Sequence, residues 1–153
     1  AIAKRENENS ILYALQSRGS GDLETIGQWD VPMRNTEGIA YVPDDGAGKL
    51  LIGNDITVEE FDIPTGRDTE LTKRPFNGRV FSYGVDDPKI GALAYFEGHL
   101  YVLMDNSRVI RVWDLPTGKL LSQVNLPAVG GGFDRQWEGL SLRCVPAPSR
   151  HSV

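Results

Sequence analysis

Short apolar segments separated by turn residues run through most of the chain. Four of them, at 38–42, 49–52, 58–63 and, more weakly, 70–76, are bounded by turns that contain Pro, Gly, Asn or Asp. These turn residues accept backbone dihedrals that other residues resist, so each segment is expected to be one strand. No window shows a sustained apolar period of about 3.6 residues, and we therefore expect few helices.

A repeated hexapeptide shows that this pattern occurs more than once. Phe-Asp-Ile-Pro-Thr-Gly at 61–66 recurs as Trp-Asp-Leu-Pro-Thr-Gly at 113–118. The Glu-Gly-Ile-Ala sequence at 37–40 likewise returns as Glu-Gly-Leu-Ser at 138–141. The spacing lies slightly above that usual for propeller blades, and each unit has room for the four strands of a blade. In the second unit these strands are expected at 93–95, 99–104, 109–115 and 120–126.

The ends of the chain supply incomplete units. Segments 11–15 and 23–31 have the pattern of the third and fourth strands of an earlier blade. The fold predicted is all-β, a partial β-propeller of about two and a half to three four-stranded antiparallel blades. The predicted division is a polar N-terminal segment (1–9), a half blade (10–32), a blade (33–77), a connection and blade (78–127), a connection and the first strand of a further blade (128–145), and a tail (146–153).

The incomplete ring predicts a partner. A propeller typically needs 4 to 8 blades, because only radial closure protects the sheet edges. We therefore expect another protein chain, or the missing part of its own chain, to cover the open edges. Nucleic acid is disfavoured because 16 Lys and Arg are mixed with 21 Asp and Glu at a net charge of −5. Direct membrane insertion is not expected, since no apolar stretch approaches about 20 residues.

Two short motifs in the sequence resemble those of a known superfamily. Thr-Glu-Gly-Ile-Ala-Tyr at 36–41 and Trp-Glu-Gly-Leu-Ser-Leu at 137–142 are similar to the blade openings of six-bladed β-propellers associated with calcium. The likeness is strongest to the phytase-like and SdiA-regulated propellers, and looser to the NHL-repeat and gluconolactonase-like groups. The resemblance slightly favours the extracellular space or an organelle lumen, whereas the single cysteine, Cys144, indicates no compartment.

The resemblance also implies a metal site. In those families a Glu at the start of the first strand commonly points toward a bound divalent cation, which makes Glu37 and Glu138 the expected calcium ligands. Calcium takes six to eight oxygens, and the turn residues that could complete the set are Asn54, Asp55, Asp105 and Asn106. The second unit departs from the pattern, with Gly91 where the Glu is expected. The alternative is that both Glu side chains are solvated or hydrogen-bonded and that the following Gly allows close packing.

Two functions remain open from the sequence. One is a β-propeller binding or structural module, part of a larger propeller or assembly. The other is a calcium-dependent hydrolase, either a phytase-like phosphoesterase or a lactonase-like enzyme, although no catalytic residue is predicted. Two structural expectations accompany both. Segments 39–41, 93–95 and 140–142 should be equivalent inner strands, and Gly66 and Gly118 should both have positive φ in hairpin turns.

Overall fold

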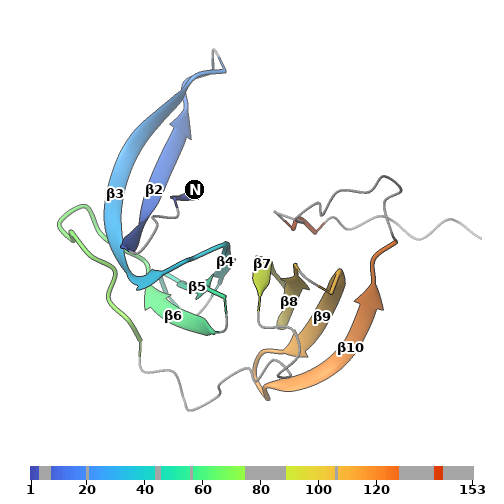
Figure 1. Cartoon of the computed structure of the whole chain (residues 1–153). Helices are drawn as coiled ribbons and strands as arrows, with labels where there is room; N and C mark the ends of the chain where they lie inside the picture. Colours follow the sequence, from blue (N-terminus) through green and yellow to red (C-terminus); the bar gives the residue numbers. More distant parts are fainter. Residues whose placement is uncertain are drawn as a thin grey trace, which may run out of the picture.

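The part of the chain that the computed structural model describes consists of strands, turns and short connections. It comprises residues 1–3, 8–19, 21–43, 46–55, 57–74, 89–105, 107–127 and 140–142. These residues form ten strands and no helix. They therefore contain no helix that is long and apolar enough to cross a membrane. The strands assemble into three antiparallel sheets of three, three and four strands (Figure 1). The predicted all-β fold, organised as a partial propeller, is confirmed.

The N-terminal sheet is a long hairpin with a short strand added to one side. Strands β2 (Asn9–Ser17) and β3 (Leu23–Arg34) form the hairpin, and β1 (Ile2–Ala3) pairs with β2. Strand β1 was not predicted, because two residues show no period and the segment is polar overall. It is fixed at its start by a reciprocal pair of bonds, in which the amino group of Ala1 donates to the Tyr13 carbonyl and the Tyr13 N–H donates to the Ala1 carbonyl.

The middle sheet has the strand order β4, β5, β6. These strands are Gly38–Val42, Lys49–Gly53 and Val58–Asp62, and they match the predicted segments apart from single residues at their ends. Successive side chains of a strand point to opposite faces of the sheet. Both faces carry buried residues here, since Leu50, Leu51 and Ile52 in succession are all at most 9% exposed.

The C-terminal sheet is a complete four-stranded unit in the order β10, β9, β8, β7. The four strands are β7 (Ile90–Phe96), β8 (His99–Met104), β9 (Val109–Asp114) and β10 (Lys119–Asn125), in agreement with the predicted second unit. Strand β7 begins earlier than predicted. Its pairing with β8 shifts register between Ile90 and Ala92, which places Gly91 in a β-bulge. The residue that departs from the repeat is therefore the one at which the strand bends.

Two apolar clusters join the three sheets. Inner strands β4 and β7 pack side by side, as Figure 1 shows near the centre of the molecule. The cluster around them contains, among others, Ala40, Leu51, Leu93, Val102 and Trp113. The cluster between the N-terminal and middle sheets contains Leu12, Val31, Met33, Leu50, Ile52, Phe61 and Leu71. The middle sheet is thus covered on both faces by its neighbours.

The described part of the predicted strand at 70–76, residues 70–74, is an irregular segment that bonds to two sheets. Within the described residues, its first half pairs with β3, where the Asp30 N–H donates to the Thr69 carbonyl and the Leu71 N–H donates to the Asp30 carbonyl. Its second half pairs with β6 at a bridge between Phe61 and Lys73, where the Asp62 N–H donates to the Thr72 carbonyl and the Arg74 N–H donates to the Glu60 carbonyl. Because the backbone bonds are divided between two partners, no continuous strand forms. The described residues 140–142 also carry no strand, so the expectation of a third inner strand there is wrong.

The second copy of the hexapeptide forms the predicted hairpin turn between β9 and β10. The Asp114 carboxylate accepts hydrogen bonds from the N–H and the hydroxyl of Thr117. The Gly118 N–H donates to the Asp114 carbonyl at 2.7 Å. The φ angle of Gly118 is 68°, a region that strains residues with a Cβ. The prediction is confirmed for this copy.

The first copy of the hexapeptide forms a different turn. Here the N–H and hydroxyl of Thr65 donate to the Asp68 carboxylate, at 2.6 and 2.8 Å, rather than to the Asp within the hexapeptide. Gly66 is not among the glycines with positive φ, so that prediction is wrong. The cause lies outside the six residues, because no strand follows directly. The Thr65 carbonyl instead accepts a hydrogen bond from the Trp29 indole of the N-terminal sheet at 3.1 Å.

Candidate functional site

Several of the predicted ligand residues gather where the middle and C-terminal sheets meet. Glu37 directly precedes β4, and its N–H donates to the Gly53 carbonyl at the end of β5 at 3.0 Å. Asp105 directly follows β8, and its side chain is only 3% exposed. Asp55 follows β5 by two residues. The antiparallel order of the strands brings these positions to the same end of the two sheets.

A lysine that sequence reasoning missed stands among these carboxylates. The ammonium of Lys89 donates a hydrogen bond to Asp105 Oδ2 at 2.9 Å and lies 3.9 Å from Glu37 Oε2. The bond to Asp105 raises the pKa of Lys89 above its usual value, and the charges of Glu37 and Asp55 raise it further, against the opposing effect of burial. We call Glu37, Asp55, Lys89 and Asp105 the ion cluster. It joins two residues of the middle sheet to two of the C-terminal sheet.

The close approach of the inner strands makes this cluster possible. A Cβ added at Gly38 would lie 2.8 Å from Leu93 Cγ and 2.9 Å from the Leu93 backbone nitrogen. Only glycine therefore allows β4 and β7 to pack at their present separation. The short distance between the strands places Glu37, just before β4, within reach of Lys89, just before β7.

The two turn residues after β5 have structural bonds of their own. The Asn54 side-chain oxygen accepts hydrogen bonds from the N–H and the hydroxyl of Thr57, at 2.8 and 3.0 Å, as is typical of an Asn that holds a turn. The Asp55 carboxylate accepts a bond from the Asn35 amide at 3.1 Å. These two residues stabilise the start of β6 and the beginning of the connection between β3 and β4.

The described part of the predicted calcium set fits an ammonium better than it fits calcium. Calcium needs six to eight oxygens at about 2.3 to 2.6 Å. Within the described residues, no group of three or more His, Cys, Asp or Glu side chains is placed to hold a metal ion. Glu138 and Asn106 lie outside those residues, so calcium binding by the complete predicted set stays a prediction. The second unit held a sequence signal for Lys89. It has Gly91 where the first unit has Glu37, and a Lys two residues before that glycine.

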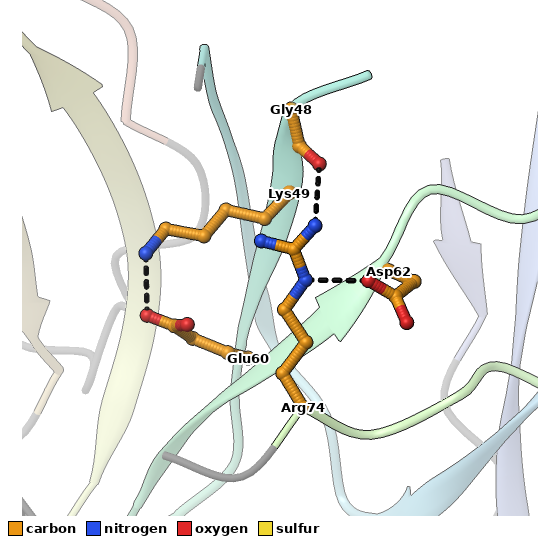
Figure 2. A network of polar contacts seen from close by, with 5 residues as sticks. All are labelled: Gly48, Lys49, Glu60, Asp62 and Arg74. Atoms are coloured by element: carbon orange, nitrogen blue, oxygen red, sulfur yellow. Dashed lines mark hydrogen bonds and ion pairs between the residues drawn. The ribbon is translucent and has the colours of Figure 1, made fainter. Parts of the chain in front are cut away.

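A second group of charges, on the outer part of the middle sheet, is structural (Figure 2). Lys49 pairs with Glu60 at 2.7 Å, and both side chains are less than 20% exposed. Arg74 donates to Asp62 at 2.5 Å and to the Gly48 carbonyl at 3.2 Å. The Arg74 bonds fasten the irregular segment after β6 to the sheet, whereas the Lys49–Glu60 pair joins β5 to β6. Each charge is matched by an opposite charge, which leaves little attraction for an outside ion.

An apolar groove lies between the N-terminal and middle sheets. Its volume is about 310 Å³, and it is lined by Leu12, Tyr13, Ala14, Trp29, Leu50, Ile63 and Pro64. Small-molecule sites combine an apolar lining with a few polar groups that orient the ligand. No ionisable group other than the Tyr13 phenol lines this groove. The groove therefore has few polar groups that could orient a ligand or react with it.

Comparison with known proteins adds no family to these observations. No known family model matches the chain, and no curated protein matches it either. The resemblance to calcium-associated six-bladed propellers therefore stays a prediction from the short motifs.

Proposed function

We propose that this chain is a structural and binding module that contributes consecutive blades to a larger propeller or assembly. The single observation that carries the proposal is a contrast between the sheets. The middle sheet is packed on both faces and exposes one large apolar side chain, that of Tyr41, whereas each outer sheet exposes several. Exposed apolar faces of this kind mark surfaces where protein partners bind.

The middle sheet shows what a blade inside a ring requires. Its residues Ala40 and Leu51 pack toward the C-terminal sheet, while Ile52 and Phe61 pack toward the N-terminal sheet. The alternation of strand side chains places these two sets on opposite faces. A blade with neighbours on both sides therefore needs apolar residues at both sets of positions.

The strand registers relate the C-terminal sheet to the middle sheet. Leu50 is paired with Phe61 in the middle sheet, and Leu100 is paired with Trp113 in the C-terminal sheet. Each of these pairs lies in the cluster shared with the preceding sheet. The opposite face of the C-terminal sheet thus corresponds to the face of the middle sheet that the C-terminal sheet covers.

This opposite face, which we call the distal face, carries a row of apolar residues. In the ladder Tyr101 is opposite Val112, and Ile110 is opposite Val124. Val124 is 52% exposed and Phe96, at the end of β7, is 36% exposed, whereas Val112 is buried at 9%. Among the three sheets formed by the described residues, none packs against the distal face, since the C-terminal sheet contacts its neighbours through the β7 side.

The occupant that fits the distal face is a further blade of the same kind. The chain itself carries a suitable surface at its other end, on the side of the N-terminal sheet that faces away from the middle sheet. Leu15 and Leu23 there are 41% and 65% exposed. For the chain in isolation, we expect the distal face to bind the N-terminal sheet of a second copy in a head-to-tail contact.

Sedimentation velocity over a concentration series tests the proposal. Wild-type chain should self-associate, and Val124→Glu should weaken the association because it places a charge in the distal face. Leu120→Glu is the matched control. It lies on the same strand and is similarly exposed, at 47%, but it pairs with Trp113 and points to the opposite face.

The outcomes separate clearly. Weaker association in Val124→Glu alone supports the distal face as the interface. A wild-type chain that stays a monodisperse monomer at every concentration contradicts the proposal. Equal effects of the two substitutions also contradict it, because they would indicate association through the edge strand and not through one face.

A further inference from the structure

We propose that the N-terminal sheet accepts an extended strand from a partner protein, which takes the place of β1 along β2 and sets a large apolar side chain in the neighbouring groove. The proposal concerns one edge of this sheet, whereas the function proposed above uses the faces of the outer sheets. Neither depends on the other.

The edge of β2 on the side of β1 is only partly covered. Strand β2 has nine residues, but β1 pairs with just two of them, Ile11 and Leu12. Ala1 adds the reciprocal pair of bonds to Tyr13. No strand of the described residues pairs with this edge at 14–17. Unpaired N–H and C=O groups at a sheet edge are a template on which another strand can pair.

The backbone groups that face this open edge belong to Leu15 and Ser17. Successive residues of an antiparallel strand direct their N–H and C=O groups to alternate sides. The Tyr13 N–H points to the side of β1, and the Arg18 N–H points the other way, across the hairpin to the Asp22 carbonyl. The extra residue of the bulge between them lies in β3, so the alternation along β2 is not interrupted. Leu15 and Ser17 therefore face the side of β1, and both are exposed.

The apolar groove lies on the face to which one residue of a longer strand would point. Ile2 of β1 is opposite Leu12 and packs against the cluster between the N-terminal and middle sheets. Ala14 is two residues further along β2, so its side chain points to the same face as that of Leu12. Both line the groove together with Trp29. A residue opposite Ala14 would thus direct its side chain toward the groove, whose volume of about 310 Å³ exceeds that of any single side chain.

The occupant that fits both features is an extended segment with two apolar residues at alternate positions. Strand β1 shows the register, because it runs antiparallel to β2 and sets Ile2 opposite Leu12. A longer strand in that register keeps this contact, bonds also to the backbone of Leu15 and Ser17, and adds a second apolar side chain opposite Ala14. In strand addition the main-chain bonds supply affinity and the side-chain pockets supply specificity. The added contacts favour the longer strand over β1.

Two synthetic peptides of the same composition test the register. Lys-Thr-Thr-Thr-Leu-Ala-Ile-Ala-Lys ends in the sequence found at 1–4 and sets its Leu opposite Ala14. Lys-Thr-Thr-Leu-Thr-Ala-Ile-Ala-Lys is the matched control, because its Leu is opposite Leu15 and points to the other face. The titration is followed by the Trp29 indole signal and the Leu15 amide signal in NMR, at a chain concentration at which sedimentation finds a monomer. The first peptide should shift both signals and bind about 10-fold more tightly, as expected for burial of roughly half a Leu side chain.

Variants of the chain test the edge and the exchange of strands. Leu15→Pro removes the outward N–H, a change that edge strands tolerate, and should weaken binding of the first peptide about 10-fold. Leu15→Thr keeps this N–H and should bind as the wild-type chain does. Ile2→Asp removes the apolar contact that holds β1 and should strengthen binding several-fold, because less is lost when β1 leaves.

A change in the peptide covers the case in which Leu15→Pro does not fold. N-methylation of the Thr directly before the Leu removes the bond to the Leu15 carbonyl and should abolish binding, whereas N-methylation of the Leu, whose N–H points away from β2, should not. The proposal is overturned if the first peptide shifts neither signal or if the two peptides bind equally. It is also overturned if the two N-methylated peptides bind alike, or if Ile2→Asp leaves the affinity unchanged.

Discussion

Replacing Gly38 by alanine tests the direct contact between inner strands β4 and β7. The added Cβ would lie 2.8 Å from Leu93 Cγ and 2.9 Å from the Leu93 backbone nitrogen. A backbone atom cannot rotate away as the end of a side chain can, so one strand must move. That movement would disturb the larger apolar cluster and the ion cluster beside it.

The size of the effect follows from two opposing contributions. Overpacking a well-packed contact costs about 1 to 3 kcal/mol, and contact with backbone places this site in the upper part of that range. Alanine in place of glycine in a strand raises the free energy of unfolding by about 0.5 to 1 kcal/mol. The net loss should be about 1 to 2 kcal/mol, which lowers the midpoint of a chain of this length by about 2 to 8 °C.

Thermal unfolding followed by circular dichroism measures this loss, with Gly66→Ala as the control. Gly66 has no heavy atom within 4 Å of an added Cβ and no positive φ, so its substitution should be neutral or slightly stabilising. A Gly38→Ala variant as stable as the wild-type chain would refute the close packing of β4 on β7. A Gly66→Ala variant that loses as much stability as Gly38→Ala would show that the contact is not the cause.

Two further predictions concern the two turns of the hexapeptide. Gly118→Ala should lower stability by about 1 to 2 kcal/mol in chemical denaturation, because φ at this position is 68°; no loss would place this glycine at negative φ. Hydrogen bonds from the N–H and then the hydroxyl of Thr65 lower the pKa of Asp68. Since the folded-state pKa is the lower one, the turn is stabilised above the usual Asp pKa and loosens as pH falls through the lowered value. Carboxyl titration by NMR should show this pKa returning part of the way upward in Thr65→Val, and an unchanged pKa would contradict the assignment.

The strands that local pattern predicts best are those whose partners are also local. Strand β8 agrees with its predicted bounds because its apolar residues are dense and its two partners are its neighbours in the chain, β7 before it and β9 after it. The predicted strand at 70–76 is richer in charged residues, and the backbone bonds of its described part go to Asp30 of β3 as well as to β6. A partner some forty residues away leaves no mark on the local pattern.

The two copies of the hexapeptide also show that local sequence alone does not determine the structure. Their sequences predict one turn, but Thr117 bonds to the Asp within its hexapeptide and Thr65 bonds to Asp68 beyond it. What differs is the chain that follows, which is a strand in one copy and a connection toward Trp29 in the other. Closely similar local sequences therefore give the same turn only where the flanking strands can pair.

The sequence named three carboxylates of the ion cluster as calcium ligands, a role that stays a prediction, and it missed the lysine that pairs with them. Short motifs and turn positions led to Glu37, Asp55 and Asp105, and the structure brings these three near one another. Lys89 lies in no motif. Its role depends on the contact between two inner strands far apart in the sequence, which no local pattern could reveal.

Methyl NMR spectra of the isolated chain at increasing concentration test the central claim most directly, namely that the distal face receives another blade. The methyl signals of Ile110 and Val124 should shift and broaden with concentration, because both lie on that face. The signals of Leu120, on the same strand but pointing the other way, should stay unchanged. Changes at Leu120 equal to those at Val124, or no concentration dependence at Ile110 and Val124, would contradict the account.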